Sequence, residues 1–460
     1  MQNPFDIPGD LDTPVSAYLK LRSFRPCFLL ESVEGGARLG RYSFIGFGNT
    51  MGVRLGSAGF EVGASRRPRP SSLTELLNGL RAALRDAPRP TAPGADVPLA
   101  GGLVGYSAYD LVRFFEQLPA SRHAQSFSEL HYVAPESLLV FDHITRGIAL
   151  LHTGSEVERQ SLRREIIAAL RCGITTGPRT ASYAPPVPSM TRQQFFQGVA
   201  RTQEYIAAGD IYQLVLSVQF SGRHQLDPFD VYRALRLINP SPYLFYCNIG
   251  DVVVIGSSPE ALVKLEHGVA ELRPIAGTRP RSNDPIEDSR HEAELLADPK
   301  ESAEHVMLVD LARNDLGRVA AAGSVHVEPY RAIERYSHVM HIVSGVRGKL
   351  APGRDAFDLF AAAFPAGTLV GAPKVRAMQI IDELEPVGRG LYGGTVGYFG
   401  KNGSMDKAIT IRSLVMRGDE YSFQAGAGIV ANSVAASEHD EVLAKSAAMA
   451  RALELAKAGF

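Results

Sequence analysis

The second half of the chain alternates short apolar runs with tight turns. YLFYCNI and VVVIGSS flank a Gly-Asp turn, and LVKLE and VAELRPI flank a His-Gly turn. LYGGTVGYFG and a strand around AITIRSLVM flank an Asn-Gly turn, and YSFQAGAG follows another turn at Gly418. Strands joined by such short turns pair antiparallel. The pattern therefore predicts mainly antiparallel sheets and excludes a doubly wound nucleotide-binding fold.

The first half repeats this pattern, for example in LLVFDH and GIALLH, and then changes to helical signals. Ser155 and Glu158 form a capping box at the start of one helix, and Thr191 and Gln194 form another. Between these two helices, residues 173–190 are rich in Pro, Gly, Ser and Thr, which is typical of a linker.

This linker divides the chain into two predicted regions, residues 1–180 and 186–460. With 460 residues the chain is long enough for more than one domain. A helix at about residues 299–313 and a last helix ending near residue 458 are expected to cover the sheets.

Composition narrows the classes of function. The formal net charge is −1, so the chain has no basic field for nucleic acid or an anionic membrane. No window approaches the roughly 20 apolar residues of a membrane span. The start, MQNPFDIPGD, lacks the features of a signal peptide, and the three cysteines are widely spaced. We therefore expect a cytoplasmic protein whose cysteines only pack.

Acidic residues near the starts of two predicted helices are candidates for a metal site. Glu304 lies in the helix that begins after Asp298, and Glu438 and Glu441 share a face of the helix predicted to begin at Ser437. Such acids are common on solvated helix faces, where they complement the helix dipole. Alternatively, acids from the two helices converge on a divalent cation such as Mg²⁺.

Four further residues could carry chemistry. Glu260 in SSPE is either a buried general acid or an exposed turn residue, and His341 is more often a hydrogen-bonded core histidine. Thr368 and the glycines of QAGAGIV offer groups that could bind an anion. Arg412, expected on a strand, could hold a carboxylate through two parallel hydrogen bonds.

Long motifs along nearly the whole chain resemble one family. They include GGLVGYSAYDLVRFFE, GDIYQLVLS, NPSPYLF, RPIAGTRPR, DPKESAEHVMLVDLARNDLGRV, ERYSHVMHIVSG, FPAGT, GAPKVRAMQIIDELEP and AGAGIV. These stretches resemble the chorismate-utilising enzymes, in particular the component I chains of anthranilate synthase. The resemblance implies an α+β fold of two packed, mainly antiparallel β-sheets with helices on the outside. It also implies chorismate as the substrate and Mg²⁺ as the cofactor.

The resemblance assigns roles by position. Glu304 and Glu441 would ligate the metal, with Glu438 close by. Glu260 would protonate the departing C4 hydroxyl, and His341, supported by Thr368, would assist proton transfer. The substrate-binding residues would be Gly277, Thr278, Tyr392, Arg412, the turn Gly426, Ala427 and Gly428, and Lys445.

Ala276 indicates the reaction within this family. In RPIAGTRPR, arginines and a threonine crowd round a small turn, as if to hold an anion, and Ala276 stands at its centre. Relatives that add water to chorismate, and many that aminate it at C4, carry Lys here. Alanine leaves room for a nucleophile that needs no activation. We therefore expect ammonia to add at C2, with pyruvate then eliminated to leave anthranilate.

The family also implies partners and regulation. The chain carries no Gly-x-Cys-x-Gly glutaminase signature, so a separate glutamine amidotransferase subunit would supply ammonia in a hetero-oligomer. Ser32 and the backbone of Pro242, Tyr243 and Leu244 would bind tryptophan as a feedback inhibitor. Leu244 stands where relatives often have Met. The alternative for these residues is a surface that joins the two regions.

The chain departs from the family pattern at several positions around the expected site. These are Val370, Lys407, Asp440, Val442 and Ala444. None is a proposed ligand or acid, but groups that support a metal site can alter its affinity. Two other functions thus stay open: a 4-amino-4-deoxychorismate synthase, and a catalytically impaired regulatory protein that binds chorismate or tryptophan.

Overall fold

The computed structural model describes residues 4–32, 40–123, 127–174, 181–282, 284–335 and 339–459. The helices are α1 (Pro14–Lys20), α2 (Leu73–Asp86), α3 (Glu156–Leu170), α4 (Arg192–Ala207), α5 (Pro228–Ile238), α6 (Pro285–Ala297), α7 (Pro299–Gly317), α8 (Ala356–Ala363), α9 (Lys374–Leu384) and α10 (Ala435–Ala458), with 3₁₀ turns η1 (Arg22–Phe24), η2 (Tyr109–Phe114) and η3 (Gly367–Leu369).

The strands of the first region are β1 (Ile7–Pro8), β2 (Phe28–Glu31), β3 (Tyr42–Gly56), β4 (Gly59–Val62), β5 (Ser65–Arg67), β6 (Gly102–Ser107), β7 (Leu130–Asp142) and β8 (Gly147–His152). Those of the second are β9 (Val187–Pro188), β10 (Gln213–Arg223), β11 (Tyr243–Ile249), β12 (Val252–Ser258), β13 (Ala261–Glu266), β14 (Val269–Leu272), β15 (Ile275–Pro280), β16 (His326–Val327), β17 (Ala332–Arg335), β18 (Val339–Val343), β19 (Val346–Lys349), β20 (Gly371–Ala372), β21 (Thr395–Gly400), β22 (Met405–Ile409), β23 (Ser413–Arg417) and β24 (Glu420–Ile429).

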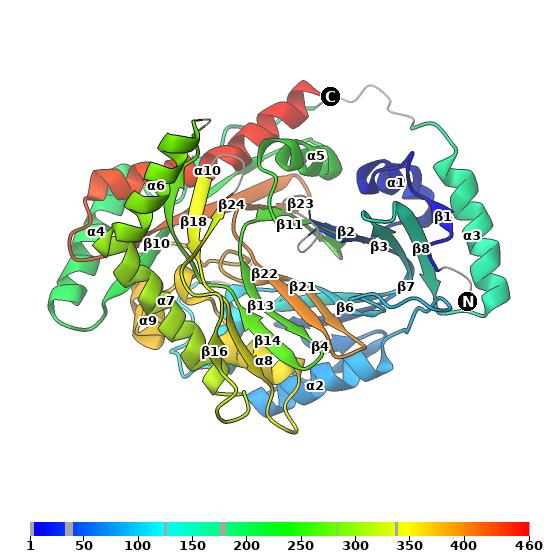
Figure 1. Ribbon diagram of the computed structural model, residues 1–460, viewed down its shortest axis with the longest axis horizontal. Coiled ribbons are helices and arrows are strands. Elements are labelled where there is room, and N and C mark those ends of the chain that lie inside the picture. The colour runs from blue at the N-terminus through cyan, green and yellow to red at the C-terminus, as the bar shows by residue number, and fades with distance from the viewer. Residues whose placement is uncertain are drawn as a thin grey trace.

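The strands form two layers with helices around them (Figure 1). One layer contains β2, β3, β11, β23 and β24, and the other contains β6, β13, β21 and β22. Every strand pair within the described residues is antiparallel, and β15, β17 and β18 form a small separate sheet. The predicted α+β fold of packed antiparallel sheets with outer helices is confirmed.

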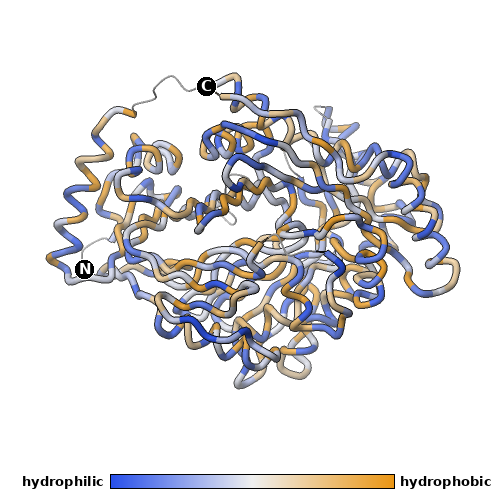
Figure 2. Tube along the Cα trace, turned by 180° about the vertical axis from the view of Figure 1, so that it is seen from behind, coloured by the Kyte–Doolittle hydropathy of each residue, from blue (hydrophilic) through white to orange (hydrophobic). Residues whose placement is uncertain are grey.

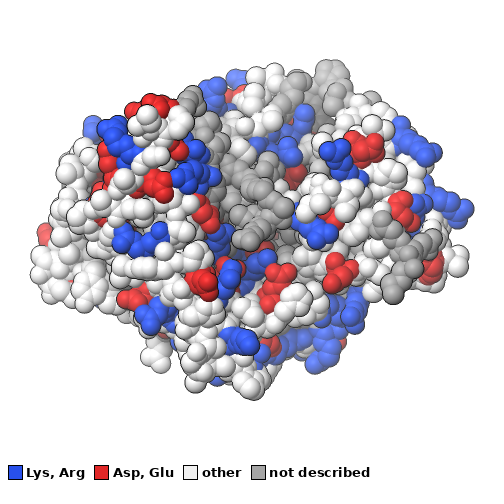
Figure 3. Space-filling view, viewed as in Figure 1, with Lys and Arg blue, Asp and Glu red and all other residues white. Residues whose placement is uncertain are grey.

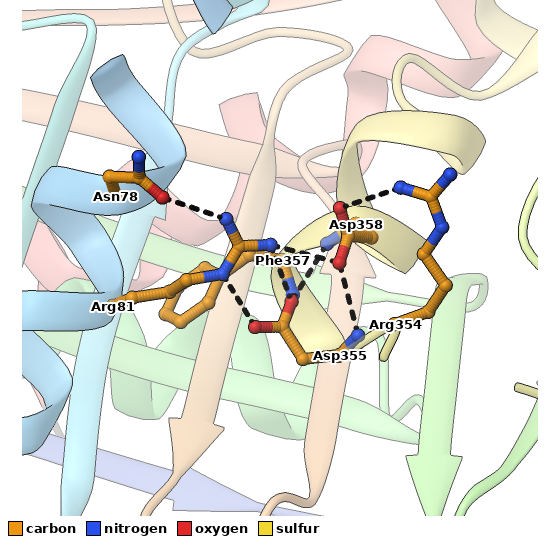
Figure 4. A network of polar contacts seen from close by, with 6 residues as sticks. All are labelled: Asn78, Arg81, Arg354, Asp355, Phe357 and Asp358. Atoms are coloured by element: carbon orange, nitrogen blue, oxygen red, sulfur yellow. Dashed lines mark hydrogen bonds and ion pairs between the residues drawn. The ribbon is translucent and has the colours of Figure 1, made fainter. Parts of the chain in front are cut away.

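Hydrogen-bonded strands connect the two predicted regions. Strand β2 pairs with β11, and β6 pairs with β21. A network of charges also connects α2 to α8 (Figure 4). In it, Arg81 Nε donates to Asp355 Oδ2 at 2.7 Å and Nη2 donates to Asp358 Oδ2 at 2.8 Å. Both regions therefore contribute to one sheet network, and the exact division into domains stays a prediction.

Side chains follow this layered plan. Both capping boxes predicted from sequence are present at the starts of α3 and α4. Along α3, at the left of Figure 2, hydrophilic and hydrophobic segments alternate, as expected for a helix that buries one face. Lys, Arg, Asp and Glu are interspersed on the face shown in Figure 3. Among the described residues, no helix is both long and apolar enough to cross a membrane.

The hairpins predicted around Gly250 and Gly268 are confirmed, but the segment around AITIRSLVM is two strands. Strand β22 ends at Ile409 and β23 begins at Ser413. Arg412 therefore lies between strands, with a left-handed φ of 50°, and its prediction as a strand residue was wrong. The break re-aims this arginine, which a continuous strand would not do.

Three further local predictions were wrong. Helix α10 begins at Ala435 after Val434, so Ser437 is not its cap. Residues 426–428 lie inside strand β24, where they pair with β10, and do not form a turn. RPIAGTRPR contains strand β15, whose register is irregular between Ala276 and Arg279. For residues 426–428 and for RPIAGTRPR, pairing with other strands, rather than local turn chemistry, decided the backbone.

Candidate active site

Glu260 lies between β12 and β13 and is the centre of the candidate site. The Thr368 hydroxyl, from η3, donates a hydrogen bond to Glu260 Oε1 at 2.9 Å. Burial raises the pKa of Glu260 to about 7, while Thr368 and the Lys445 ammonium act in the opposite direction. A carboxyl with such a pKa can hold a proton near neutral pH and donate it, as a general acid must.

A cavity of about 50 Å³ lies beside Glu260 and Thr368. Its walls include the apolar side chains of Leu308 and Leu311 from α7, together with Ala366. These walls keep bulk water away from one side of the carboxyl, which agrees with the raised pKa of Glu260. The space suits a molecule of the size of water or ammonia.

Helices α7 and α10 bring two of the predicted metal ligands near each other. Burial raises the pKa of Glu304, and the carboxylates of Glu301 and Glu441 raise it further. Glu441 accepts from Lys445 Nζ at 2.5 Å. Two acids from separate helices fit a hard cation such as Mg²⁺, which binds one or two carboxylates and keeps several waters.

Glu438 is less clearly part of this arrangement. In the described parts of the chain, no group of three or more His, Cys, Asp or Glu side chains is arranged to hold a metal ion. Two carboxylates with waters remain the arrangement that these residues can offer to a cation.

Three polar groups lie beside the acids. Lys445 Nζ donates to the carbonyl of Gly426 at 3.1 Å. A Cβ at Gly426 would lie 2.8 Å from the Tyr392 hydroxyl, so glycine there permits the close approach of the tyrosine. Burial lowers the pKa of Arg412, opposed by nearby Tyr392 and Glu441. Tyr392, Arg412 and Lys445 are thus brought to the same place from distant segments.

His341 lies on the small sheet, opposite the bulged strand β15. Its Nδ1 lies 2.8 Å from the carbonyl oxygen of Gly277 and 3.1 Å from the Thr278 hydroxyl. Because a carbonyl only accepts, Nδ1 carries the proton, and Nε2 is then the acceptor nitrogen. Gly277 has a φ of +71°, which favours glycine. The predicted trio of Gly277, Thr278 and His341 is therefore in mutual contact.

The arginines of RPIAGTRPR do not form the anion site that their number suggested. Arg273 pairs with Glu334, and Arg281 Nε donates to Asp288 at 2.8 Å. Arg279 pairs with Asp298 at 2.8 Å and with Glu301. Each guanidinium already faces a carboxylate, so the impression from the sequence that these arginines hold an anion does not match their contacts.

The predicted tryptophan residues lie where the two regions pair. Leu244 on β11 faces Glu31 on β2, and Ser32 follows directly. The Ser32 hydroxyl is buried and has no hydrogen-bond partner within the described residues. The carboxylate of Glu31 accepts from Arg236 at 3.0 and 3.1 Å. Ser32 thus presents an unsatisfied polar group beside Pro242–Leu244.

Glu385 and Arg389, which lie behind Thr368 and Glu260, were not predicted from the sequence. Their side chains form an ion pair at 2.7 Å, and each is 2% exposed. The available signal was an acid and a base four residues apart, in a stretch that also contains the acids Asp382 and Glu383. That spacing is typical of exposed helix pairs, so it did not indicate burial.

A family model described as chorismate binding enzyme matches residues 27–451 of this chain. The chain belongs to this family. Anthranilate synthase component 1 of Thermus thermophilus is 45% identical, with 98% of this chain and 97% of that protein covered. The corresponding protein of Aquifex aeolicus is 44% identical, with 97% and 93% covered. The resemblance to component I chains is thereby confirmed.

Solved structures of chorismate binding enzymes agree. The crystal structure of anthranilate synthase component I from Streptococcus pneumoniae has a TM-score of 0.80 at 32% identity, covering 96% of this chain and 98% of that one. A menaquinone-specific isochorismate synthase from Escherichia coli has a TM-score of 0.70 at 21% identity and shares the fold. The chain is therefore an enzyme of the chorismate binding family.

The departures from the pattern of chorismate binding enzymes are compatible with the fold. Val370 is fully buried, and its carbonyl accepts from the backbone N–H of Val215 at 2.9 Å. Val442 is also fully buried, whereas Asp440 and Ala444 are exposed. Lys407 is the unusual case, because its ammonium lies 4.3 and 4.0 Å from the ring centres of Tyr132 and Phe399.

Proposed function

We propose that the chain is a component I of anthranilate synthase, which converts chorismate and ammonia to anthranilate, pyruvate and water. The observation that carries the proposal is Glu260, a buried carboxyl with a pKa near 7 held by Thr368. The names of relatives at 45% and 44% identity support it. The function is proposed as the first step of tryptophan biosynthesis.

Glu260 is the general acid in this proposal. Its proton passes to the C4 hydroxyl of chorismate as that group departs as water, while ammonia bonds to C2. The product of this step is 2-amino-2-deoxyisochorismate. Loss of the C2 hydrogen and departure of the enolpyruvyl group as pyruvate then leave the aromatic ring. We assign His341 to proton transfer, because its Nδ1 is held by Gly277 and its Nε2 is the acceptor.

Ala276 selects ammonia over water. Its methyl group is 7% exposed, in strand β15 opposite Ile342, and offers neither a base nor a nucleophile. Water needs a base to become a strong nucleophile, whereas neutral ammonia does not. The arginines of the same segment are paired with carboxylates, so they do not replace the missing lysine.

Mg²⁺ is the proposed cofactor, with Glu304 and Glu441 as its ligands and Glu438 nearby. Glu304 is partly buried near two other carboxylates, an arrangement that a divalent cation would stabilise. When bound, the ion would neutralise and orient a carboxylate of chorismate. We assign the second carboxylate to Arg412, Tyr392 and Lys445, with the backbone of Gly426, Ala427 and Gly428 beside them.

The proposal includes a partner and an inhibitor. A glutamine amidotransferase subunit would supply ammonia, because the name component 1 of the relatives implies a further component. Tryptophan would inhibit by binding Ser32 and the backbone of Pro242–Leu244. The buried hydroxyl of Ser32, which has no partner among the residues that the structure describes, supports this site, since a buried donor without a partner is costly.

The test is the product formed by the purified chain alone from chorismate, Mg²⁺ and ammonium at mildly alkaline pH, where free ammonia is more abundant. Anthranilate is identified by fluorescence and mass, and pyruvate by a coupled assay in equal amount. Accumulation of aminodeoxychorismate or isochorismate would contradict the assignment. No product would favour a regulatory binding protein.

A further inference from the structure

The buried pair of Glu385 and Arg389 lies behind the candidate active site, at the end of α9. Arg389 donates from Nη2 to Glu385 Oε1 at 2.7 Å and from Nε to Oε2 at 2.9 Å. Both side chains are 2% exposed. Removing two charges from water is expensive, and such a pair is weak evidence for stability. Its remaining contacts therefore indicate its role.

One set of contacts reaches strand β10, which pairs with the proposed substrate-binding backbone of residues 426–428. Glu385 Oε1 accepts from the Ser217 N–H at 2.9 Å and from its hydroxyl at 2.6 Å. Arg389 Nη2 donates to the carbonyl of Val215 at 2.8 Å. Ser217 and Val215, on β10, pair with Gly426 and Gly428 on the facing strand β24. The ion pair thus sets the position of the strand against which residues 426–428 are held.

A second set of contacts reaches the general acid. Arg389 Nη1 donates to the carbonyl of Leu369 at 2.6 Å. Leu369 follows Thr368, whose hydroxyl donates to Glu260. The Arg389 guanidinium also lies 5.6 Å from the ring centre of Tyr392. One side chain is therefore connected to the acid, to the tyrosine and to the glycine strand.

We propose that the Glu385–Arg389 ion pair is a positioning device for the reaction, which holds Thr368 against Glu260 and keeps Tyr392 and residues 426–428 in register with them. The proposal rests on the function proposed above. The pair would act through the direction of its hydrogen bonds. The planar guanidinium donates in fixed directions to Glu385, Leu369 and Val215, and an ammonium cannot reproduce these directions.

Arg389→Lys tests the proposal because it keeps the positive charge and loses the guanidinium N–H groups that donate in several fixed directions. We expect the ammonia-dependent kcat to fall about 10- to 100-fold, since small misplacements of reacting groups cost up to about 10²-fold. Arg113→Lys is the matched control. Arg113 pairs with Asp382 on the same helix and with Asp110, but it contacts no residue of the site. We expect this control to stay within about twofold of the parent rate, as is usual away from such sites.

A double-mutant cycle with Thr368→Val separates positioning from stability. If Arg389 acts through Thr368, the double variant should be scarcely slower than the slower single variant. The alkaline decline of kcat should also move to higher pH in both single variants, because the Thr368 hydrogen bond lowers the pKa of Glu260. Rate factors that simply multiply, with an unmoved pH profile, would overturn the proposal.

Glu385→Gln provides a second route through the same cycle if Arg389→Lys does not fold. The glutamine keeps the shape of Glu385 but leaves the guanidinium without its counter-charge. If neither variant accumulates as folded protein, the pair serves stability alone and the proposal fails. Failure of the proposed function is distinguishable, because the parent chain would then form no anthranilate in the same assay.

Discussion

Glu260 and Lys407 are both ionisable side chains whose charged forms burial disfavours. Burial raises the pKa of Glu260 and lowers that of Lys407 well below its usual range. For Glu260 the shift produces an acid that is still protonated near neutral pH. Lys407 instead lies in an aromatic setting, with its Nζ 3.2 Å from the Tyr132 hydroxyl. Burial thus produces a proton donor at Glu260, whereas at Lys407 it lowers the stability of the protein.

Glu260→Gln should lower the ammonia-dependent turnover by about 10²- to 10⁴-fold, the usual contribution of a general acid. With free ammonia held constant, the parent rate should fall as pH rises through about 7, because Glu260 loses its proton there. Steady-state kinetics across pH measure both effects. Glu266→Gln, on the partly exposed side of the adjoining strand, is the control.

The same variant should not lose stability at pH 8. The folded pKa of Glu260 is raised from 4.5 to about 7, so its favourable contribution is complete below pH 4.5 and is lost as pH rises through 7. A neutral amide avoids this loss. Thermal unfolding at pH 8 should give an unchanged or higher midpoint for Glu260→Gln. A near-parental rate would remove Glu260 from the mechanism.

Lys407→Met should raise the free energy of unfolding at pH 7 by roughly 1 to 3 kcal/mol, because the buried amine exchanges its hydration for a contact with the Tyr132 hydroxyl, a cost that an apolar methionine avoids. Burial disfavours the charged form of Lys407, and this effect outweighs the nearby Cys247 and Asp406, which favour it. Urea unfolding of both proteins measures the difference.

The pH dependence gives a second check on Lys407. Its folded pKa is lowered, so the unfolded chain binds more protons between that value and the ordinary lysine pKa of about 10.4. The parent protein should therefore gain stability relative to Lys407→Met as pH rises toward 10. A constant difference across pH would contradict a pKa of Lys407 that burial lowers.

Helices α7 and α10 illustrate what whole elements contribute. Neither acidic stretch indicated a metal site by itself, because acids at the start of a helix are common. The packing of the elements brings Glu304 and Glu441 close enough for one carboxylate to raise the pKa of the other. Lys445, one turn beyond Glu441, partly compensates that repulsion through its 2.5 Å contact. The candidate metal site is therefore a property of two helices together.

Glu304→Gln and Glu441→Gln should each raise the Mg²⁺ concentration required for half-maximal activity, because a neutral amide is a poorer ligand for a hard cation. We expect a shift of about 10-fold or more, with partial recovery at high Mg²⁺, as for changes that disturb a metal site. Calorimetric titration of Mg²⁺ provides a readout besides activity. Glu454→Gln, further along α10, is the matched control.

An unchanged Mg²⁺ midpoint in both variants would show that Glu304 and Glu441 are ordinary helix acids. Glu260→Gln should differ from them, because it should lose turnover without a change in Mg²⁺ dependence. The contrast distinguishes a metal ligand from a proton donor within one set of assays.

Paired strands join the two regions of the chain. The candidate tryptophan site lies at this junction, and its residue Ser32 is distant in sequence from the catalytic residues. Strand β2 pairs with β11, and β11 leads through β12 to Glu260. A ligand between Ser32 and Leu244 would therefore contact the hairpin that carries the general acid. Inhibition requires tryptophan to favour a state with lower affinity for chorismate, and linkage makes the effect reciprocal.

Ser32→Arg should abolish tryptophan inhibition and leave ammonia-dependent activity nearly intact, because a long cation fills the pocket. Ser32→Ala should weaken inhibition with less disturbance. A typical coupling of about 1 to 3 kcal/mol corresponds to a 5- to 150-fold effect on chorismate affinity. Inhibition curves and uninhibited rates are measured together. Full tryptophan sensitivity in an active Ser32→Arg protein would rule out this site.

The sequence by itself determined the antiparallel class, several hairpins and the positions of four helices, α3, α4, α7 and α10. These features follow from local chemistry: turn residues, alternation of apolar side chains and capping boxes such as Ser155 with Glu158. The motifs also identified Glu260, Glu304 and Glu441 as candidates. Contacts between residues distant in sequence were not determined locally, because turn and cap signals act over only a few residues.

Only the tertiary structure decided the environment of each candidate. Gly426 belongs to a strand because β10 pairs with it, and the arginines of RPIAGTRPR are engaged because carboxylates of other elements face them. Glu385 and Arg389 resembled an exposed helix pair until packing buried them. Burial and charge pairing depend on neighbours that other elements supply, so pKa values and ligand geometry emerge only when the sheets and helices have assembled.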